Sequence, residues 1–319
     1  ASTTAGCPYL LEDGRCAIHA EHGAAAKPKV CRQFPYRFTV FPATAGKNGY
    51  AGTLTPPVVT VDGECWDLER ALADGEASLF DGQVADGTSD VPAASAAQHE
   101  VDQVWAMGPV LERVPSQTFV DPFTPMGTER WEMLRRGVEG DLADGVEPLA
   151  ALAALLASVE RATPDFLNEA RWAATYPGRF GRVSPGQVDW LSETLARMVE
   201  RWAAEGQAWR ARLLPILLTG IEALGTEAER DLPTGAARRL FTRNISTHLL
   251  SQNVLKKDNL EYGIVFLYWR MRIARAAGSR HSAVDSLVAT NKLLKDRRIG
   301  EFFRQNQVLL RRLALVGQG

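Results

Sequence analysis

The sequence contains few cysteines, and all of them lie near one end of the chain. Four occur among 319 residues, at Cys7, Cys16, Cys31 and Cys65, and none follows. Cysteines that only filled a hydrophobic core would be scattered along the chain. Their clustering indicates that they converge, either on a metal centre or in a pair of disulfides.

The chain also lacks a long apolar run and a marked excess of one charge. No run of eighteen apolar residues occurs, and no signal-peptide pattern is present. We therefore expect a cytoplasmic protein that does not enter a membrane. The formal net charge of −2 gives no general attraction to nucleic acid. Because cytoplasmic thiols stay reduced, this compartment favours a metal centre over disulfides.

Motifs of the common enzyme classes are missing as well. The sequence has no Gly-x-Gly-x-x-Gly, no Walker loop, no Gly-x-Ser-x-Gly and no His-Glu-x-x-His. It also lacks the Cys-x-x-x-Cys-x-x-Cys arrangement of radical enzymes that use S-adenosylmethionine. Any S-adenosylmethionine site would therefore require a pocket of another kind.

The first cysteines are separated by a turn signal. Asp13-Gly14 is a typical two-residue turn, and it predicts that Cys16 folds back beside Cys7. Further along, Pro28 and Pro35 stand on either side of the third cysteine. Since proline restricts the backbone around it, we expect an ordered loop there and not a helix.

Two extended segments follow the third cysteine. Residues 36–40 alternate between apolar and polar side chains, and residues 58–61 form a second β-rich run. Together they predict a β-hairpin that returns Cys65 to the other three cysteines. The alternative is that Cys65 is a free, buried cysteine beside Trp66.

Four thiolates can hold either a [4Fe-4S] cluster or one Zn²⁺ ion. Structural zinc sites usually use closely spaced Cys-x-x-Cys pairs, and this sequence has none. Separations of nine, fifteen and thirty-four residues favour an iron–sulfur cluster held by a folded framework. His19 and His22 could add imidazole ligands, although exposed histidines beside the site are the simpler reading.

The cysteine segment also carries an ordered pattern of other residues around its cysteines. The pattern comprises Cys7, Tyr9, Leu10, Asp13, Gly14, Arg15, Cys16, Ile18, His19, Lys27, Pro28, Cys31, Arg32, Phe34 and Pro35. It resembles the YkgJ-type cysteine-cluster family, which is described as a zinc- or iron-chelating domain and includes the flagellin lysine-N-methylases. The resemblance covers about a tenth of the chain, and the family's upstream Cys-x-x-Cys and Cys-Cys pairs have no counterpart before Cys7.

The resemblance implies a protein-lysine N-methylase that uses S-adenosylmethionine on a flagellin-like protein substrate. The alternative is a non-catalytic metalloprotein, in which a structural metal stabilises the N-terminal module and the helical surface binds a protein partner. In both readings the predicted metal ligands are Cys7, Cys16, Cys31 and Cys65. Arg32 is the predicted cofactor-binding residue, since a fixed positive charge could stabilise a thiolate cluster or pair with an acidic group.

The whole sequence predicts an α+β protein with a small cysteine module and a large, irregular helical domain. We place the metal-binding module at residues 1–85, a linker or mobile loop at 86–98, where Ala, Asp, Ser, Gly and Pro predominate, and the helical domain at 99–319. Helices are expected at about 100–113, 127–143, 147–162, 207–224, 235–252, 258–277 and 298–316. The segment 258–277 is apolar on most sides, which places it at the centre of the bundle.

Capping patterns and a proline refine this helical prediction. Residues 184–187 read Ser-Pro-Gly-Gln, which is typical of a helix start, and Ser282 with Asp285 repeats the capping pattern. Pro215 is expected to kink or interrupt its helix. The apolar stripe predicted after residue 187 comprises Leu191, Leu195, Met198, Val199 and Trp202.

A basic run lies near the C-terminal end of the sequence. Such a run could bind nucleic acid or an acidic partner, but a solvated helix face is the more ordinary explanation. Its members are Lys292, Lys295, Arg297, Arg298, Arg304, Arg311 and Arg312.

Overall fold

Most of the chain that the structure describes is α-helical. The computed structural model describes residues 9, 11, 16–33, 36–40, 58–61, 111–113, 117–119, 125–161, 186–204, 208–226, 233–250, 254, 259–294 and 297–316. The predicted predominance of helix is confirmed. The predicted linker 86–98 lies outside the described residues, so the domain boundaries stay a prediction.

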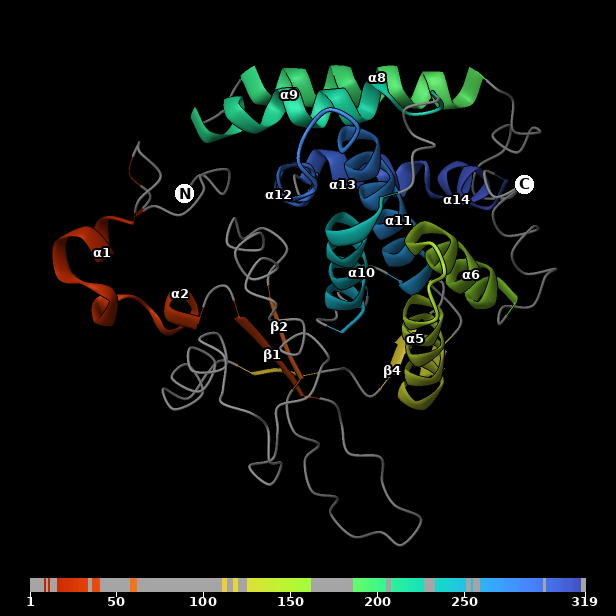
Figure 1. Ribbon diagram of the computed structural model, residues 1–319, viewed down its shortest axis with the longest axis horizontal. Helices are drawn as coiled ribbons and strands as arrows, with labels where there is room; N and C mark the ends of the chain where they lie inside the picture. The colour runs from red at the N-terminus through yellow and green to blue at the C-terminus, as the bar shows by residue number, and fades with distance from the viewer. Residues whose placement is uncertain are drawn as a thin grey trace, which may run out of the picture.

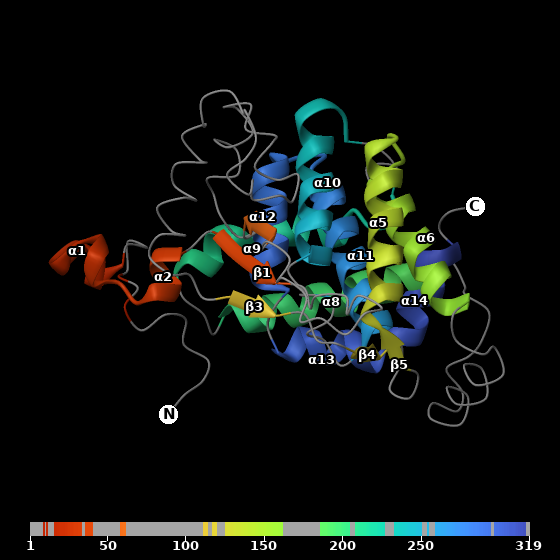
Figure 2. The same cartoon turned by 90° about the horizontal axis from the view of Figure 1, so that it is seen from below.

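Helix α11 (Leu260–Ala277) forms the centre of the molecule. Sixteen of its eighteen residues are buried, which confirms the predicted central helix. It packs against α9 (Ala208–Glu222), α12 (Ala283–Leu293), α6 (Pro148–Arg161) and α14 (Gln307–Val316), as Figures 1 and 2 show. Within the described residues, no helix combines the length and the apolar character that crossing a membrane requires.

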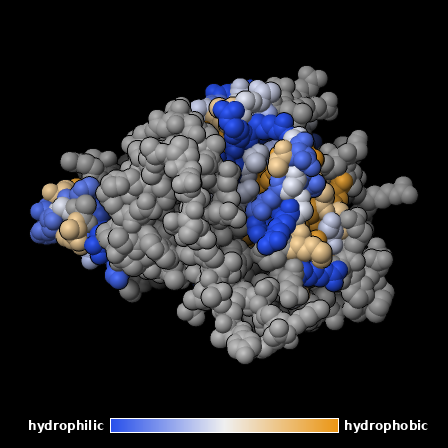
Figure 3. Space-filling model, turned by 60° about the horizontal axis from the view of Figure 1, so that its bottom comes forward, coloured by the Kyte–Doolittle hydropathy of each residue, from blue (hydrophilic) through white to orange (hydrophobic). Residues whose placement is uncertain are grey.

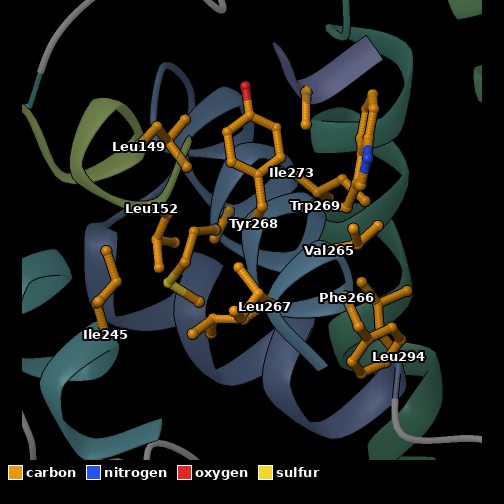
Figure 4. Packing of buried hydrophobic residues seen from close by; sticks show 14 of the residues in the cluster. Leu149, Leu152, Ile245, Val265, Phe266, Leu267, Tyr268, Trp269, Ile273 and Leu294 are labelled. Atoms are coloured by element: carbon orange, nitrogen blue, oxygen red, sulfur yellow. The ribbon is translucent and has the colours of Figure 1, made fainter. Parts of the chain in front are cut away.

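Side chains from the surrounding helices fill the space around α11. Figure 4 shows Leu149 and Leu152 of α6 and Ile245 of α10 (Gly235–Leu250) gathered around α11, where Leu267 also lies. All four side chains are almost completely buried. Full burial of such a side chain stabilises the fold by about 1.5–3 kcal/mol, so apolar packing is the main source of this domain's stability.

Two glycines let backbones approach α11 closely. A Cβ atom on Gly220 of α9 would lie 2.4 Å from the carbonyl oxygen of Ile273. A Cβ atom on Gly263, within α11, would lie 2.2 Å from the carbonyl oxygen of Val254. Since real Cβ atoms do not come so close, glycine is required at both positions.

Helix α8 (Gly186–Ala204) lies beside α9, along the top of Figure 1. Leu191, Leu195 and Val199 are fully buried, as the predicted apolar stripe requires. The hydroxyl of Ser192 donates a 2.6 Å hydrogen bond to the carbonyl oxygen of Ile221, which ties the two helices together.

Pro215 lies inside α9 without ending it, so of the two expected outcomes the interruption is wrong and the kink stays a prediction. Pro215 is exposed, and water can therefore satisfy the carbonyl group that loses its N–H partner. Packing of α9 against α8, α11 and α12 supplies the remaining stability.

The predicted capping at Ser282 is confirmed. Its hydroxyl oxygen accepts a 3.1 Å hydrogen bond from the backbone N–H of Asp285, at the start of α12. Asn259 caps α11 in the same way, accepting a 2.7 Å bond from the N–H of Tyr262. Both helices therefore begin where a side chain replaces a missing backbone acceptor.

The segment predicted as one helix at 298–316 forms two, α13 (Arg297–Gln305) and α14. Asn306 separates them. Its backbone N–H and its side-chain amide both donate to the carbonyl oxygen of Phe302, at 3.1 Å and 2.8 Å. A side chain that competes for the helix's own hydrogen bonds explains the break, which the apolar pattern did not reveal.

The turn between α5 (Thr128–Ala143) and α6 is held by two arginines. Glu147 accepts a 2.8 Å bond from the N–H of Ala150 at the start of α6, and it forms a 3.2 Å ion pair with Arg275 of α11. Arg238 of α10 donates to the carbonyl oxygens of the two residues before Glu147. These contacts fix the C-terminal end of α5 against the bundle.

A small sheet includes the two predicted strands. β1 (Tyr36–Val40) pairs antiparallel with β2 (Val58–Val61), with Tyr36 opposite Val61. β3 (Leu111–Arg113) pairs parallel with the other side of β1, which gives the order β2-β1-β3. Strand β2 also contacts α10.

Strand β3 corrects the predicted helix at 100–113, which is wrong for its last three residues. The spacing of apolar residues in so short a stretch does not distinguish strand from helix, and pairing with β1 decides the outcome. A second antiparallel pair, β4 (Gln117–Phe119) with β5 (Pro125–Gly127), leads into α5.

Candidate metal centre

Cys16 stands immediately before a short helix, α1 (Ala17–His22). Its backbone is extended, and its carbonyl oxygen accepts a 3.0 Å hydrogen bond from Ala20. The helix ends at Gly23, whose φ of 79° lies in the left-handed region that glycine favours. None of the residues of α1 is buried.

A backbone hydrogen bond closes the segment in front of α1. The N–H of Ala17 donates to the carbonyl oxygen of Tyr9 at 2.7 Å. Residues 9 and 17 therefore lie side by side, as a chain reversal between them requires. The turn predicted at Asp13-Gly14 stays a prediction, because both turn residues and Cys7 lie outside the described residues.

Cys31 lies in a short helix, α2 (Lys29–Gln33), and not in the predicted loop. The carbonyl oxygen of Pro28 accepts hydrogen bonds from Cys31 and Arg32, at 2.9 Å and 3.0 Å. A proline just before a helix needs no N–H acceptor, so it can start a helical turn. The predicted loop is therefore wrong, because Pro28 directly precedes the helix and does not interrupt it.

Two of the four predicted ligands, Cys16 and Cys31, belong to the described residues. Cys16 is half-buried, Cys31 is exposed, and both are free cysteines. Both thiols are therefore available to a metal, as ligation requires. Cys65, like Cys7, lies outside the described residues, and no group of three metal-binding side chains occurs in the remainder. The four-thiolate centre stays a prediction.

Arg32, the predicted cofactor-binding residue, lies in the last turn of α2 and is half-buried. His19 and His22 are both exposed on α1. The Nε2 atom of His22 lies 3.7 Å from a carboxylate oxygen of Glu21, which is also exposed. Both imidazole rings are therefore solvent-exposed on α1, as expected for histidines that are not metal ligands.

Buried charges within the helical bundle were not anticipated from the sequence. Arg311, a member of the basic C-terminal run, is buried and forms a 2.8 Å ion pair with Glu261 of α11. Arg270 of α11 is also buried and donates a hydrogen bond to Asn291 of α12. Because Arg311 points into the protein, it does not belong to a surface basic patch.

No family model matches the chain, and neither the curated proteins nor the solved structures include a match to it.

Proposed function

We propose that the N-terminal segment holds a metal centre, either an iron–sulfur cluster or zinc, through Cys7, Cys16, Cys31 and Cys65. The hydrogen bond between Ala17 and the carbonyl of Tyr9 carries the proposal. It links the residue after Cys16 to a residue two positions after Cys7. Such a reversal is what two distant thiols need before they can share one centre.

The burial pattern supports the same proposal. Helix α1 buries none of its residues, and Tyr9 and Leu11 in front of it are 50% and 38% exposed. Apolar packing therefore contributes little to the stability of this segment. Metal–thiolate bonds supply folding free energy directly, and they would crosslink segments that the hydrophobic effect leaves unsupported.

Two functional classes follow from a metal centre at this position. The resemblance of the cysteine segment supports a protein-lysine N-methylase that uses S-adenosylmethionine on a flagellin-like protein. The alternative is a structural metal site in a non-catalytic protein whose helical surface binds a partner. Buried packing of large aromatic residues such as Trp269 and Phe266 accords with a helical domain built as a scaffold.

Elemental analysis tests the proposal when combined with single substitutions. The protein is purified anaerobically, and iron, zinc and acid-labile sulfide are measured for the wild type and for Cys16→Ser, Cys31→Ser and Arg32→Ala. We expect stoichiometric metal in the wild type and loss of metal from both cysteine variants. A wild type without metal, or cysteine variants that retain it fully, would contradict the proposal.

Binding of S-adenosylmethionine separates the two functional classes. Calorimetry on the metal-loaded protein detects binding if the protein is a methylase, and transfer of a labelled methyl group to flagellin lysines then follows. Absence of binding, with the metal present, leaves the structural role. If Arg32→Ala keeps its metal but loses binding, Arg32 contacts the cofactor or the substrate.

A further inference from the structure

One face of helix α5 is exposed along its whole length. Its residues follow the spacing of a helix–helix contact, with steps of three, four, three and four positions. We call this face the outer seam, and all of its members are exposed. The outer seam comprises Arg130, Met133, Gly137, Gly140 and Asp144.

The opposite face of α5 holds the helix in place. Trp131, Val138 and Leu142 are buried there, and α5 packs against α6, α10 and β5. The outer seam is therefore not needed for the fold of the described chain. On the face of the molecule that Figure 3 shows, strongly hydrophilic and hydrophobic described residues lie next to one another.

The apolar members of the outer seam are unusual for an exposed helix. Met133 is 65% exposed, more than any other large hydrophobic residue among those described. Gly137 and Gly140 weaken the helix relative to alanine, and a Cβ atom on either would meet nothing within 4 Å. The described residues therefore give no packing reason for glycine here. Bare backbone at these positions allows another helix to approach closely, with Met133 of one helix filling the space above a glycine of the other.

The charged members of the outer seam oppose the helix dipole. Arg130 is the third residue of α5, and Asp144 directly follows its last residue. A positive charge near the N-terminus and a negative charge near the C-terminus are both unfavourable. Among the described residues the ion pair of α5 is Arg135 with Glu139, and Arg130 and Asp144 form none. Within the part of the chain that the structure describes, no ion pair compensates either charge.

The outer seam is complementary to itself when reversed. Arg130 and Asp144 lie seven positions on either side of Gly137, while Met133 lies four before it and Gly140 three after it. Two antiparallel copies related by a twofold axis at Gly137 would place each Arg130 opposite Asp144 of the other copy. Each Met133 would then lie opposite position 141 of the other copy, next to its Gly140.

We propose that the outer seam is a homodimer interface, formed by two antiparallel α5 helices from two copies of this chain. The two Arg130–Asp144 contacts offset the unfavourable dipole terms, and the glycines permit the close crossing. A twofold interface of this kind uses the same surface on both partners. One helix pair buries less than the roughly 1,200 Å² of a typical stable complex, so we expect a weak, concentration-dependent dimer.

Charge exchange provides the main test. Sedimentation velocity of the full chain, over a wide concentration range, compares the wild type with Asp144→Arg, Arg130→Glu and the double variant. We expect the wild type to pass from monomer to dimer. Each single variant should weaken dimerisation about tenfold or more, because two like-charged contacts replace two attractive ones. The double variant should return to within about threefold of the wild type, because exchanging both charges restores the two attractive contacts.

The design separates dimerisation from folding. Both single changes favour the helix dipole, so thermal unfolding of the monomer should not worsen. Arg201→Glu, on the exposed side of α8, is the matched charge change outside the seam. A wild type that stays monomeric, a double variant that does not recover, or an equal loss in Arg201→Glu would each overturn the proposal.

A crosslink tests the position of the twofold axis. Gly137→Cys places a thiol at the helix crossing, and mild oxidation should give a dimer that is reversed by reductant. Gly186→Cys, at another exposed helical glycine, is the control and should give no covalent dimer, as should the wild type with its native cysteines. Equal crosslinking of both variants, or none of Gly137→Cys, would contradict the antiparallel arrangement.

Discussion

Helices α1 and α11 show two different ways of stabilising a segment of this chain. Helix α11 buries sixteen of its eighteen residues at the centre of the bundle. Helix α1 buries none and lies away from the bundle, at the left of Figure 1 and of Figure 3. Burial of apolar side chains therefore stabilises α11, but it cannot account for the stability of α1.

This contrast indicates that a bound metal would stabilise the N-terminal segment and not the bundle. Loss of a metal from the N-terminal segment should remove structure locally, while the bundle keeps its own core. The independence of the two regions can be measured through the effect of single substitutions on the free energy of unfolding of the helical bundle.

Removing one partner of the buried ion pair should have the largest effect on the bundle. In Arg311→Met, the carboxylate of Glu261 keeps its buried position without its arginine. The exposed fractions of the two side chains are only 8% and 4%, so water cannot replace the lost partner. We expect a loss of about 3–5 kcal/mol in urea unfolding.

A second arginine–glutamate pair is the matched control. Arg304 and Glu301 lie 3.1 Å apart, but their side chains are 50% and 47% exposed. Arg304→Met should change the free energy of unfolding by less than about 1 kcal/mol. Similar losses in both variants would mean that burial of the Arg311 pair is not what makes it important.

Adding a methyl group between α9 and α11 should have the next largest effect. Gly220→Ala places a Cβ atom against the carbonyl oxygen of Ile273, which forces the helices apart and costs about 1–3 kcal/mol. Gly140→Ala, where a Cβ atom meets nothing, should be neutral or stabilise by up to about 1 kcal/mol. Thermal melts of dilute protein measure both, and a neutral Gly220→Ala would refute the close approach.

Loss of the cap of α11 should have a smaller effect. Asn259→Ala removes the acceptor for the N–H of Tyr262 and should cost about 1 kcal/mol, whereas Asn259→Asp should retain most of the stability. Equal losses in the two variants would indicate that Asn259 acts through packing and not through capping.

Removing a cysteine should have the smallest effect on the bundle and the largest on the N-terminal segment. We expect Cys31→Ser to leave bundle unfolding nearly unchanged, while limited proteolysis cleaves before about Ala97 first. Mass spectrometry of the fragments locates the cuts. Equal sensitivity along the whole chain would mean that the two regions fold as one unit.

The sequence predicted those features that depend on local pattern. The apolar stripe around Leu195, the central position of α11 and the cap at Ser282 all follow from residues a few positions apart. The alternation in residues 36–40 likewise predicted strand β1. In each case the decisive neighbours are close in sequence.

Features that depend on distant partners could not be predicted in this way. Arg311 reads as part of a basic surface until Glu261, fifty residues earlier, is placed beside it. Strand β3 depends on β1, and the role of Gly220 depends on the backbone of Ile273. In the candidate site Ala17 lies beside Tyr9, while the turn predicted at Asp13-Gly14 falls outside the described residues and stays a prediction. The helix at Cys31 was predicted as a loop.

X-ray absorption at the metal edge of the anaerobically purified protein tests the central claim most directly. It counts the sulfur atoms bound to the metal and gives their distances. The account predicts a sulfur-only first shell, with four sulfurs at about 2.3 Å if the metal is zinc, and loss of the signal in Cys31→Ser. A shell of nitrogen and oxygen ligands, or one that Cys31→Ser leaves unchanged, would contradict the account.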